Sequence, residues 1–267
     1  MANTVFFAWQ LDTKIEDNRS FIWESIKLAC AQLENEATPE LSPRPERDTE
    51  GVPGTPNIVQ TIFGKIDECS IFVADVSFIA KTNGGKLIPN PNVLLELGYA
   101  VKTIGWERTI LVLNNAHGNA DNLPFDMLQH RWPIEYRITS ETKVREKRWN
   151  DLSSTLLEAL KNCEGFSLTR AKKMMNALDT DTFSIVAIHE NDGFIQMPMP
   201  ARTMGELMNS VNHTASIRRL IDLGAIRVVD KPYFGYAWTT DGLLMIKEIN
   251  KANPGMLRIL KRAAASS

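Results

Sequence analysis

Apolar and amphipathic segments alternate along the first 165 residues of the chain. Three apolar runs, at residues 4–9, 70–77 and 108–113, have the length and composition of buried strands. Segments with helical spacing of their apolar positions separate or follow these runs, at residues 20–35, 58–66, 91–101 and 142–163. Such alternation is typical of a parallel sheet whose strands are joined by right-handed helical crossovers. The sequence therefore predicts an α/β fold for this part of the chain.

The pattern changes after residue 165. Helical spacing predicts helices at residues 168–190, 203–210 and 212–223, and alternating segments at 225–229 and 236–239 predict a hairpin, followed by a last helix. This order of elements resembles winged helix-turn-helix domains. So do the sequences Arg-Leu-Ile-Asp-Leu-Gly-Ala-Ile-Arg-Val and Tyr-Ala-Trp-Thr-Thr-Asp-Gly. We therefore expect two domains, at residues 1–165 and 166–267.

The composition excludes several classes of protein. With 43% hydrophobic residues, 23% charged residues and a net charge of −2, the chain has the composition of a soluble globular protein. No apolar run reaches membrane-spanning length, so we expect a cytoplasmic protein without a membrane partner. The cysteines, Cys30, Cys69 and Cys163, are far apart and predict neither a disulfide framework nor a metal site.

Charge is distributed unevenly between the two predicted domains. Residues 1–165 contain 17 Lys and Arg against 23 Asp and Glu, a balance of −6. Residues 166–267 contain 13 against 9, a balance of +4. A mildly basic second domain is compatible with a nucleic-acid partner but does not require one.

The segment at residues 89–100, Pro-Asn-Pro-Asn-Val-Leu-Leu-Glu-Leu-Gly-Tyr-Ala, is the main candidate for chemistry. Asn90 is suited to cap a helix whose first position is a proline. Glu96 lies off the apolar stripe of this helix, and Asn92 and Tyr99 share its polar flank because they are four residues before and three after it. The alternative is that Glu96 is a solvated helix charge.

Polar residues also follow the predicted strands at their carboxyl ends, where open α/β sheets bind ligands. Asp75 lies near the end of the second apolar run, and Trp9 and Arg19 flank the polar loop after the first. Asp126 follows the third run in Leu-Pro-Phe-Asp. We expect these residues to bind substrate together with Asn90, Asn92 and Tyr99. The alternatives are that Asp75 caps a turn and that Trp9 packs in the core.

A long segment at residues 38–56 contains five prolines and two glycines and predicts a loop. A loop of this length inside a compact domain is usually functional or disordered. Its Asp48 is a further candidate for substrate binding.

The sequences Phe-Val-Ala-Asp-Val, the 89–100 segment and Leu-Pro-Phe-Asp together resemble bacterial TIR-like domains and nucleoside 2-deoxyribosyltransferases, over roughly residues 3–138. Both families have a flavodoxin-like sheet and a glutamate on the matching helix. The TIR resemblance implies that Glu96 catalyses cleavage of the nicotinamide ribosyl bond of NAD, and that the active enzyme is a homo-oligomer. NAD is then the substrate, and no cofactor is implied. The transferase resemblance implies that Glu96 attacks the deoxyribose and that Asp75 holds the base.

Three functions therefore remain open. The first is an N-glycosidase, specifically an NAD hydrolase, gated by the second domain. Its domain combination resembles bacterial antiphage effectors. The second is a nucleoside or nucleotide 2-deoxyribosyltransferase or hydrolase. The third is a regulator without catalysis that senses a nucleotide and binds DNA.

In a winged-helix domain, residues 212–223 would be the recognition helix. Cationic and polar side chains there are candidates for contact with DNA phosphates, which orient a protein on DNA without reading its sequence. These candidates are His213, Ser216, Arg218 and Arg219 on the helix, and Arg227 and Lys231 on or near the wing. The alternative is a protein-binding or dimerisation module.

Overall fold

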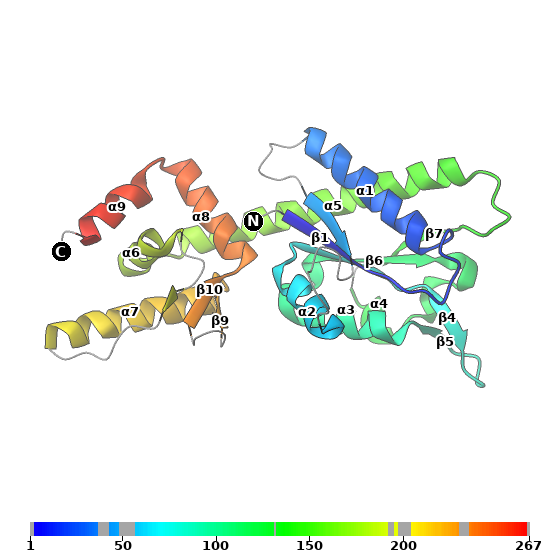
Figure 1. The fold of residues 1–267 in the computed structure, drawn as a ribbon, viewed down its shortest axis with the longest axis horizontal. Coiled ribbons are helices and arrows are strands. Elements are labelled where there is room, and N and C mark those ends of the chain that lie inside the picture. The colour runs from blue at the N-terminus through cyan, green and yellow to red at the C-terminus, as the bar shows by residue number, and fades with distance from the viewer. Residues whose placement is uncertain are drawn as a thin grey trace. The chain divides into compact units, whose positions relative to one another are not determined.

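The computed structural model describes residues 3–36, 43–47, 57–130, 132–191, 195–196, 204–229 and 235–265. The chain divides into two compact units, Met1–Glu164 and Gly165–Ser267 (Figure 1).

The division falls inside the helix α5, Arg145–Asn176. We expected separate helical segments at 142–163 and 168–190, but α5 is continuous through Gly165 and is followed by α6, Thr180–His189. A single glycine in a helix costs only about 1 kcal/mol relative to alanine, which does not end the helix. The break comes later, where the side chain of Asp179 accepts a hydrogen bond of 2.8 Å from the backbone N–H of Thr182 and caps α6.

The first unit is built on a five-stranded parallel sheet. Its strands are β1 (Asn3–Ala8), β2 (Pro43–Arg47), β3 (Ile71–Asp75), β6 (Thr109–Asn114) and β7 (Ile134–Tyr136). They pair in the order β2-β1-β3-β6-β7, and every pairing is parallel. Counted along the chain within this sheet, the order is 2-1-3-4-5, which is that of flavodoxin-like sheets. The predicted α/β class with a parallel sheet is confirmed.

The strand β2 lies inside the segment for which we expected only a loop. Its register with β1 runs from Asn3 opposite Pro43 to Phe7 opposite Arg47. Proline has no backbone N–H and is tolerated on edge strands, where alternate N–H positions face away from the sheet. Pro43 and Pro45 are two residues apart and can both take such positions. The Pro-rich composition of this segment therefore predicted a loop, although part of it forms an edge strand.

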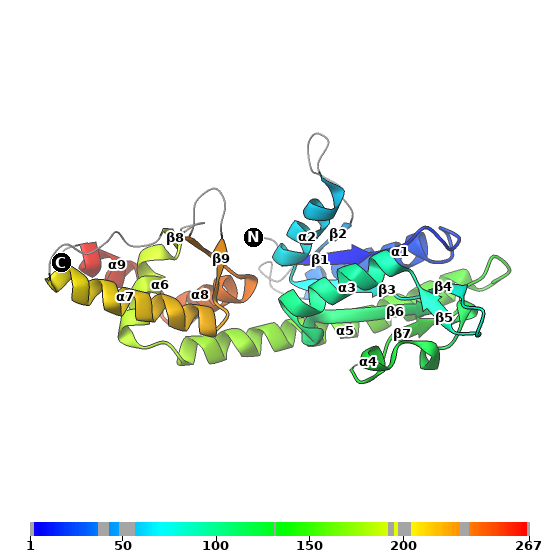
Figure 2. The ribbon, with the colours of Figure 1, turned by 90° about the horizontal axis from the view of Figure 1, so that it is seen from below.

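Helices cover both faces of this sheet (Figures 1 and 2). The helix α1 (Arg19–Glu36) and the part of α5 in the first unit pack on one face, with a core that includes Phe7, Ile71, Val73, Leu152, Leu156 and Leu160. The helices α2 (Ile58–Glu68) and α3 (Pro91–Ile104) pack on the other, with a core that includes Phe6, Ala8, Phe72, Ala74, Val93 and Leu97. Adjacent strand residues thus divide between the two faces, as the period of two requires.

An antiparallel hairpin lies between β3 and α3 and turns at residues 82–86. It pairs β4 (Phe78–Lys81) with β5 (Leu87–Pro89). The chain between α3 and β7 also forms 3-10 turns η2 (Trp106–Arg108), η3 (Asn115–His117) and η4 (Ala120–Asn122), and the short helix α4 (Phe125–Leu128). Gly85, with a φ of 88°, takes the left-handed position in the turn, and its backbone N–H donates to the carbonyl of Thr82 at 2.9 Å, which closes the hairpin.

The second unit contains a three-stranded sheet and several helices. The strands β8 (Ile195–Gln196), β10 (Gly235–Trp238) and β9 (Ile226–Val229) pair antiparallel in that order. The remaining helices are α7 (Met204–Asp222), α8 (Thr240–Ala252) and α9 (Met256–Ala265).

The helix α7 corrects one expectation. We predicted two helices, at 203–210 and 212–223, but residues 204–222 are all described and form one helix. Residues 206–222 contain neither proline nor glycine, so nothing in this stretch ends a helix. The hairpin of β9 and β10 is present as predicted, whereas the turn expected between the two helices is missing. The winged-helix class stays a prediction.

Candidate functional site

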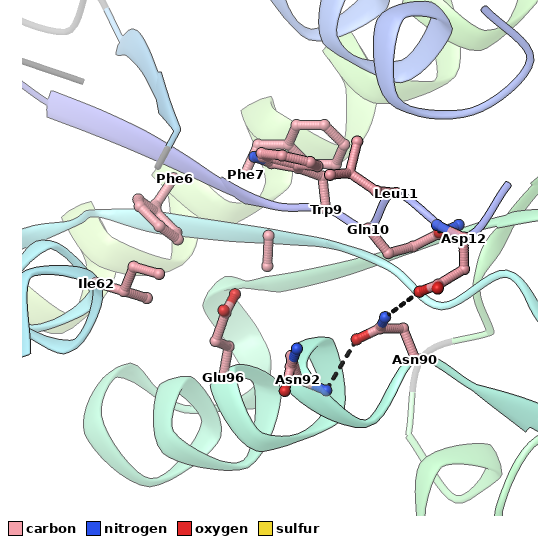
Figure 3. A pocket seen from close by; sticks show the side chains of 11 residues that line it. Phe6, Phe7, Trp9, Gln10, Leu11, Asp12, Ile62, Asn90, Asn92 and Glu96 are labelled. Atoms are coloured by element: carbon pink, nitrogen blue, oxygen red, sulfur yellow. Dashed lines mark hydrogen bonds between the residues drawn. The ribbon is translucent and has the colours of Figure 1, made fainter. Parts of the chain in front are cut away.

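A cavity lies beside the carboxyl end of β1, on the face of the sheet covered by α2 and α3 (Figure 3). Its volume is about 260 Å³. It is lined by the chain from β1 into the following loop, by one residue of α2 and by residues at the start of α3: Phe6, Phe7, Ala8, Trp9, Gln10, Leu11, Asp12, Ile62, Asn90, Asn92 and Glu96. The charged residues in this lining, Asp12 and Glu96, are both acidic.

Local sequence determines how α3 presents its polar side chains. The Asn90 side chain accepts hydrogen bonds from the backbone N–H groups of Asn92 (2.8 Å) and Val93 (3.1 Å), so the predicted cap is present. The apolar stripe is buried against the sheet through Val93, Leu97, Ala100 and Ile104. Asn92 and Glu96 are four residues apart and therefore lie on one flank of the helix. Glu96 points from α3 toward β1 (Figure 3) and is half-buried, and Asn92 lines the same cavity.

Asn92 differs from Gln10, Asp12 and Asn90 in the availability of its side chain. The side chains of Gln10, Asp12 and Asn90 are engaged in hydrogen bonds with one another or with neighbouring residues. The side-chain amide of Asn92, by contrast, makes no hydrogen bond with other described residues and is exposed. Asn92 is therefore available to bind a polar group of a ligand beside Glu96.

Asp12 is a residue of the cavity that the sequence analysis missed. Its Oδ2 accepts a hydrogen bond of 2.5 Å from Nδ2 of Asn90, which joins the loop after β1 to the start of α3 (Figure 3). The criterion that selected Asp75, a carboxylate just beyond a strand at the carboxyl edge, applies equally to Asp12. The same rule, used at every strand end, would have identified Asp12.

Asp75 does not reach the cavity. It is fully buried, and its side chain accepts hydrogen bonds from the backbone N–H of Ser77 (3.0 Å), from Nε2 of Gln10 (3.3 Å) and from Nδ2 of Asn18 (3.1 Å to Oδ2). Burial raises the pKa of Asp75, and the hydrogen bonds from Ser77, Asn18 and Gln10 oppose the shift. The bond to Ser77 closes a turn two residues on, which is the alternative left open by the sequence.

A network of buried polar groups surrounds Asp75 on the face of α1. Asn114 connects three chain segments there. Its Nδ2 donates to Oδ1 of Asn18 (3.0 Å) and to the carbonyl of Ile138 (2.9 Å), and its backbone N–H donates to Oγ of Ser77 (2.8 Å). The hydroxyl of Tyr136 donates to the carbonyl of Asp17 (3.0 Å), and burial raises the pKa of Tyr136 well above its ordinary value. These groups satisfy one another, so this face of the carboxyl edge is closed.

Trp9 and Arg19 form a pair on the α1 face. The guanidinium carbon of Arg19 lies 3.6 Å from the centroid of the Trp9 ring. The ring packs against the core between the sheet and α1, on the far side of β1 from Glu96 (Figure 3). Residue Trp9 borders the cavity, but the structure does not bring its ring to Glu96. Its position agrees with the core-packing alternative.

Two other predicted substrate-binding residues, Tyr99 and Asp126, lie outside the cavity lining. Tyr99 stacks on Phe63 of α2, with ring centroids 4.2 Å apart, and its hydroxyl donates to Asp67 at 2.8 Å. Asp126 is exposed in α4. Asp48 lies outside the described residues. Of the predicted set, the structure therefore brings together Glu96, Asn92 and Asn90.

The predicted partner-binding residues of the second unit are mostly engaged. Ser216 is buried, so its hydroxyl is not exposed for the predicted contact with a partner. Arg219 donates to the carbonyl of Ala177 and, at 2.8 Å, to Oδ2 of Asp179, and Arg218 pairs with Asp222 at 3.3 Å. Burial and the nearby His189 lower the pKa of the half-buried His213. Arg227 is exposed on β9, and Lys231 lies outside the described residues.

Within the described part of the chain, no three His, Cys, Asp or Glu side chains are grouped so that they could hold a metal ion. Among the same residues, no helix is both long and apolar enough to cross a membrane. No protein-family model matches the chain, and no curated protein matches it either.

Proposed function

We propose that the first unit cleaves the N-glycosidic bond of a nucleotide, with NAD as its substrate. The observation that carries this proposal is that Glu96 and Asn92 lie together on one flank of α3 and line a cavity at the carboxyl end of β1. Ligands of open α/β sheets bind at this edge. The resemblance of the 89–100 segment to TIR-like domains names the same glutamate.

The chemistry needs a negative charge next to an anomeric carbon. Cleavage moves the bonding electrons from the sugar carbon onto the ring nitrogen of nicotinamide, which leaves as a neutral base. The ribosyl group then carries an oxocarbenium-like positive charge. A carboxylate in the position of Glu96 stabilises this charge electrostatically or by forming a glycosyl–enzyme bond. Water supplies the hydroxyl group of the ADP-ribose product, and one proton is released.

The charges and the size of the cavity favour this end of the substrate. The described lining residues include the carboxylates Asp12 and Glu96 and no lysine or arginine, so they favour a cation over a phosphate. Pockets for drug-sized ligands measure about 300–1,000 Å³, whereas this cavity has about 260 Å³. It therefore suits the ribosyl-nicotinamide end of NAD, and the rest of the dinucleotide would extend beyond it.

The deoxyribosyltransferase alternative has less support. That resemblance assigns Asp75 the task of holding the base, but the carboxylate of Asp75 is buried and bound by Ser77, Gln10 and Asn18. The enclosed carboxylate of Asp75 therefore has no room for a base, and it lies away from Glu96.

A substrate panel tests the proposed function. Purified protein is incubated with NAD, with a mixture of deoxynucleosides and free bases, or with nucleoside monophosphates, and the products are separated by chromatography. The series includes several protein concentrations, because an enzyme that acts as a homo-oligomer gains activity with concentration. We expect nicotinamide and ADP-ribose from NAD only. Base exchange among deoxynucleosides without NAD cleavage would establish the transferase instead. Nucleotide binding without any turnover would favour the regulator.

A further inference from the structure

Two side-chain amides in the lining of the cavity, those of Gln10 and Asn90, each donate a hydrogen bond to a carboxylate. The side chain of Gln10 donates from Nε2 to Asp75 (3.3 Å), and its oxygen accepts from the backbone N–H of Asp12 at 2.6 Å. The side chain of Asn90 donates from Nδ2 to Asp12 (2.5 Å), and its oxygen accepts from the backbone of α3. The two pairs are joined through Asp12, whose backbone N–H donates to Gln10 while its carboxylate accepts from Asn90. A chain of hydrogen bonds thus runs from β3, through the loop after β1, to the start of α3.

The carboxylate of Asp12 decides which way the amide of Asn90 points. An ionised carboxylate only accepts hydrogen bonds, so it selects the NH2 end of the amide. The carbonyl end of Asn90 is thereby turned toward the backbone N–H groups of Asn92 and Val93, which it caps. With the amide reversed, its NH2 would face these two N–H donors and the cap would be lost.

We propose that Asp12 is a positioning residue for Asn92 and Glu96, and that it acts through the amide of Asn90 on the first turn of α3. Asp12 itself need not touch the substrate. This inference rests on the proposed function, because it assigns Asp12 a role in the same cavity. Nothing in the sequence pattern of α3 itself reveals the role, since Asp12 is 78 residues away from Asn90.

Asp12→Asn and Asp12→Ala separate the hydrogen bond from the charge. The amide oxygen of an asparagine can still accept from Nδ2 of Asn90, whereas an alanine removes the acceptor. Asp121→Ala is the control, because Asp121 is an exposed aspartate of η4 outside the cavity lining. Hydrogen–deuterium exchange at the backbone amides of Asn92 and Val93 then reports the cap directly, in the full chain and without any substrate.

We expect exchange at these two amides to become roughly tenfold faster in Asp12→Ala, the size expected for loss of a helix cap. Asp12→Asn should restore slow exchange, and Asp121→Ala should leave it unchanged. In the NAD assay, Asp12→Ala should lower kcat about tenfold or more with a smaller change in KM, because a displaced Glu96 loses contact mainly with the transition state. Asp12→Asn should recover most of this kcat.

Two outcomes would overturn the inference. One is unchanged exchange in Asp12→Ala, which would show that Asp12 does not hold the cap. The other is an equal loss of kcat in both variants, which would show that the charge of Asp12 acts on the substrate itself. A wild-type protein that cleaves no substrate refutes the proposed function alone, since the exchange experiment still decides whether Asp12 positions α3.

Discussion

Asp75 and Glu96 lie on opposite sides of the central sheet. Asp75 follows Ile71 and Val73 in the alternation of β3, so its side chain joins Asn18 on the face of α1. Glu96 extends from α3, which covers the other face. One carboxylate is therefore enclosed by hydrogen-bond donors, and the other borders a cavity. They cannot act on one substrate in this arrangement, although both lie near the carboxyl edge of the sheet.

Replacement of Asp75 by asparagine tests its buried state. Burial raises the pKa of Asp75 above its ordinary value of 3.8, so the native state binds this proton more tightly than the unfolded state. Its contribution to stability is fully present below pH 3.8 and is lost as the pH rises through the raised value. We therefore expect the unfolding free energy of the wild type, relative to Asp75→Asn, to fall over this pH range. Urea titrations at a series of pH values measure it. If the unfolding free energy of the wild type relative to Asp75→Asn instead rose with pH, the raised pKa of Asp75 would be contradicted.

Replacement by alanine should have opposite effects on protein stability at two glycines. A Cβ atom at Gly242 would lie 2.0 Å from the backbone oxygen of Ala225, which cannot move aside, so Gly242→Ala should destabilise the second unit by about 1–3 kcal/mol or more. At Gly165, inside α5, a Cβ atom would meet nothing within 4 Å. Gly165→Ala should stabilise the protein by about 0.5–1 kcal/mol. Thermal unfolding compares the two, and similar effects in both variants would contradict the packing around Gly242.

Adjacent arginines on α7 should contribute very differently to stability. Arg219 donates to the carbonyl of Ala177, near the end of α5, and to the cap residue of α6. Arg218, within the described part of the chain, pairs with Asp222 one turn along its own helix. We expect Arg219→Ala to cost about 1–2 kcal/mol and Arg218→Ala less than about 0.5 kcal/mol. Chemical denaturation checks this order. Equal costs would show that Arg219 does not anchor α7.

Much of the first unit follows from its sequence. The apolar runs at β1, β3 and β6 are buried on both faces of a parallel sheet, so their composition alone marks them as strands. The cap at Asn90 and the shared flank of Asn92 and Glu96 follow from local geometry, because both depend only on spacing within one helix. The candidate catalytic flank was therefore predictable without knowledge of the rest of the fold.

Features that depend on contacts between distant segments were not predictable in this way. The edge strand β2 is recognised only by its pairing with β1, because its prolines suggest a loop. Tyr99 shares a helix flank with Glu96 in sequence, but the neighbouring Phe63 and Asp67 of α2 hold its ring and hydroxyl. The link between Asp12 and Asn90 likewise joins two segments that no local pattern connects.

The most direct test of the central claim is the rate of nicotinamide release from NAD by Glu96→Gln. Glutamine keeps the shape of the side chain and removes the charge that would face the ribosyl cation. Glu141→Gln is the matched control, since Glu141 is exposed and lies outside the cavity lining. We expect Glu96→Gln to lose at least about 100-fold in rate with an unchanged melting temperature, and Glu141→Gln to keep the wild-type rate. Wild-type turnover in Glu96→Gln would contradict the assignment of Glu96 and of this cavity as the active site.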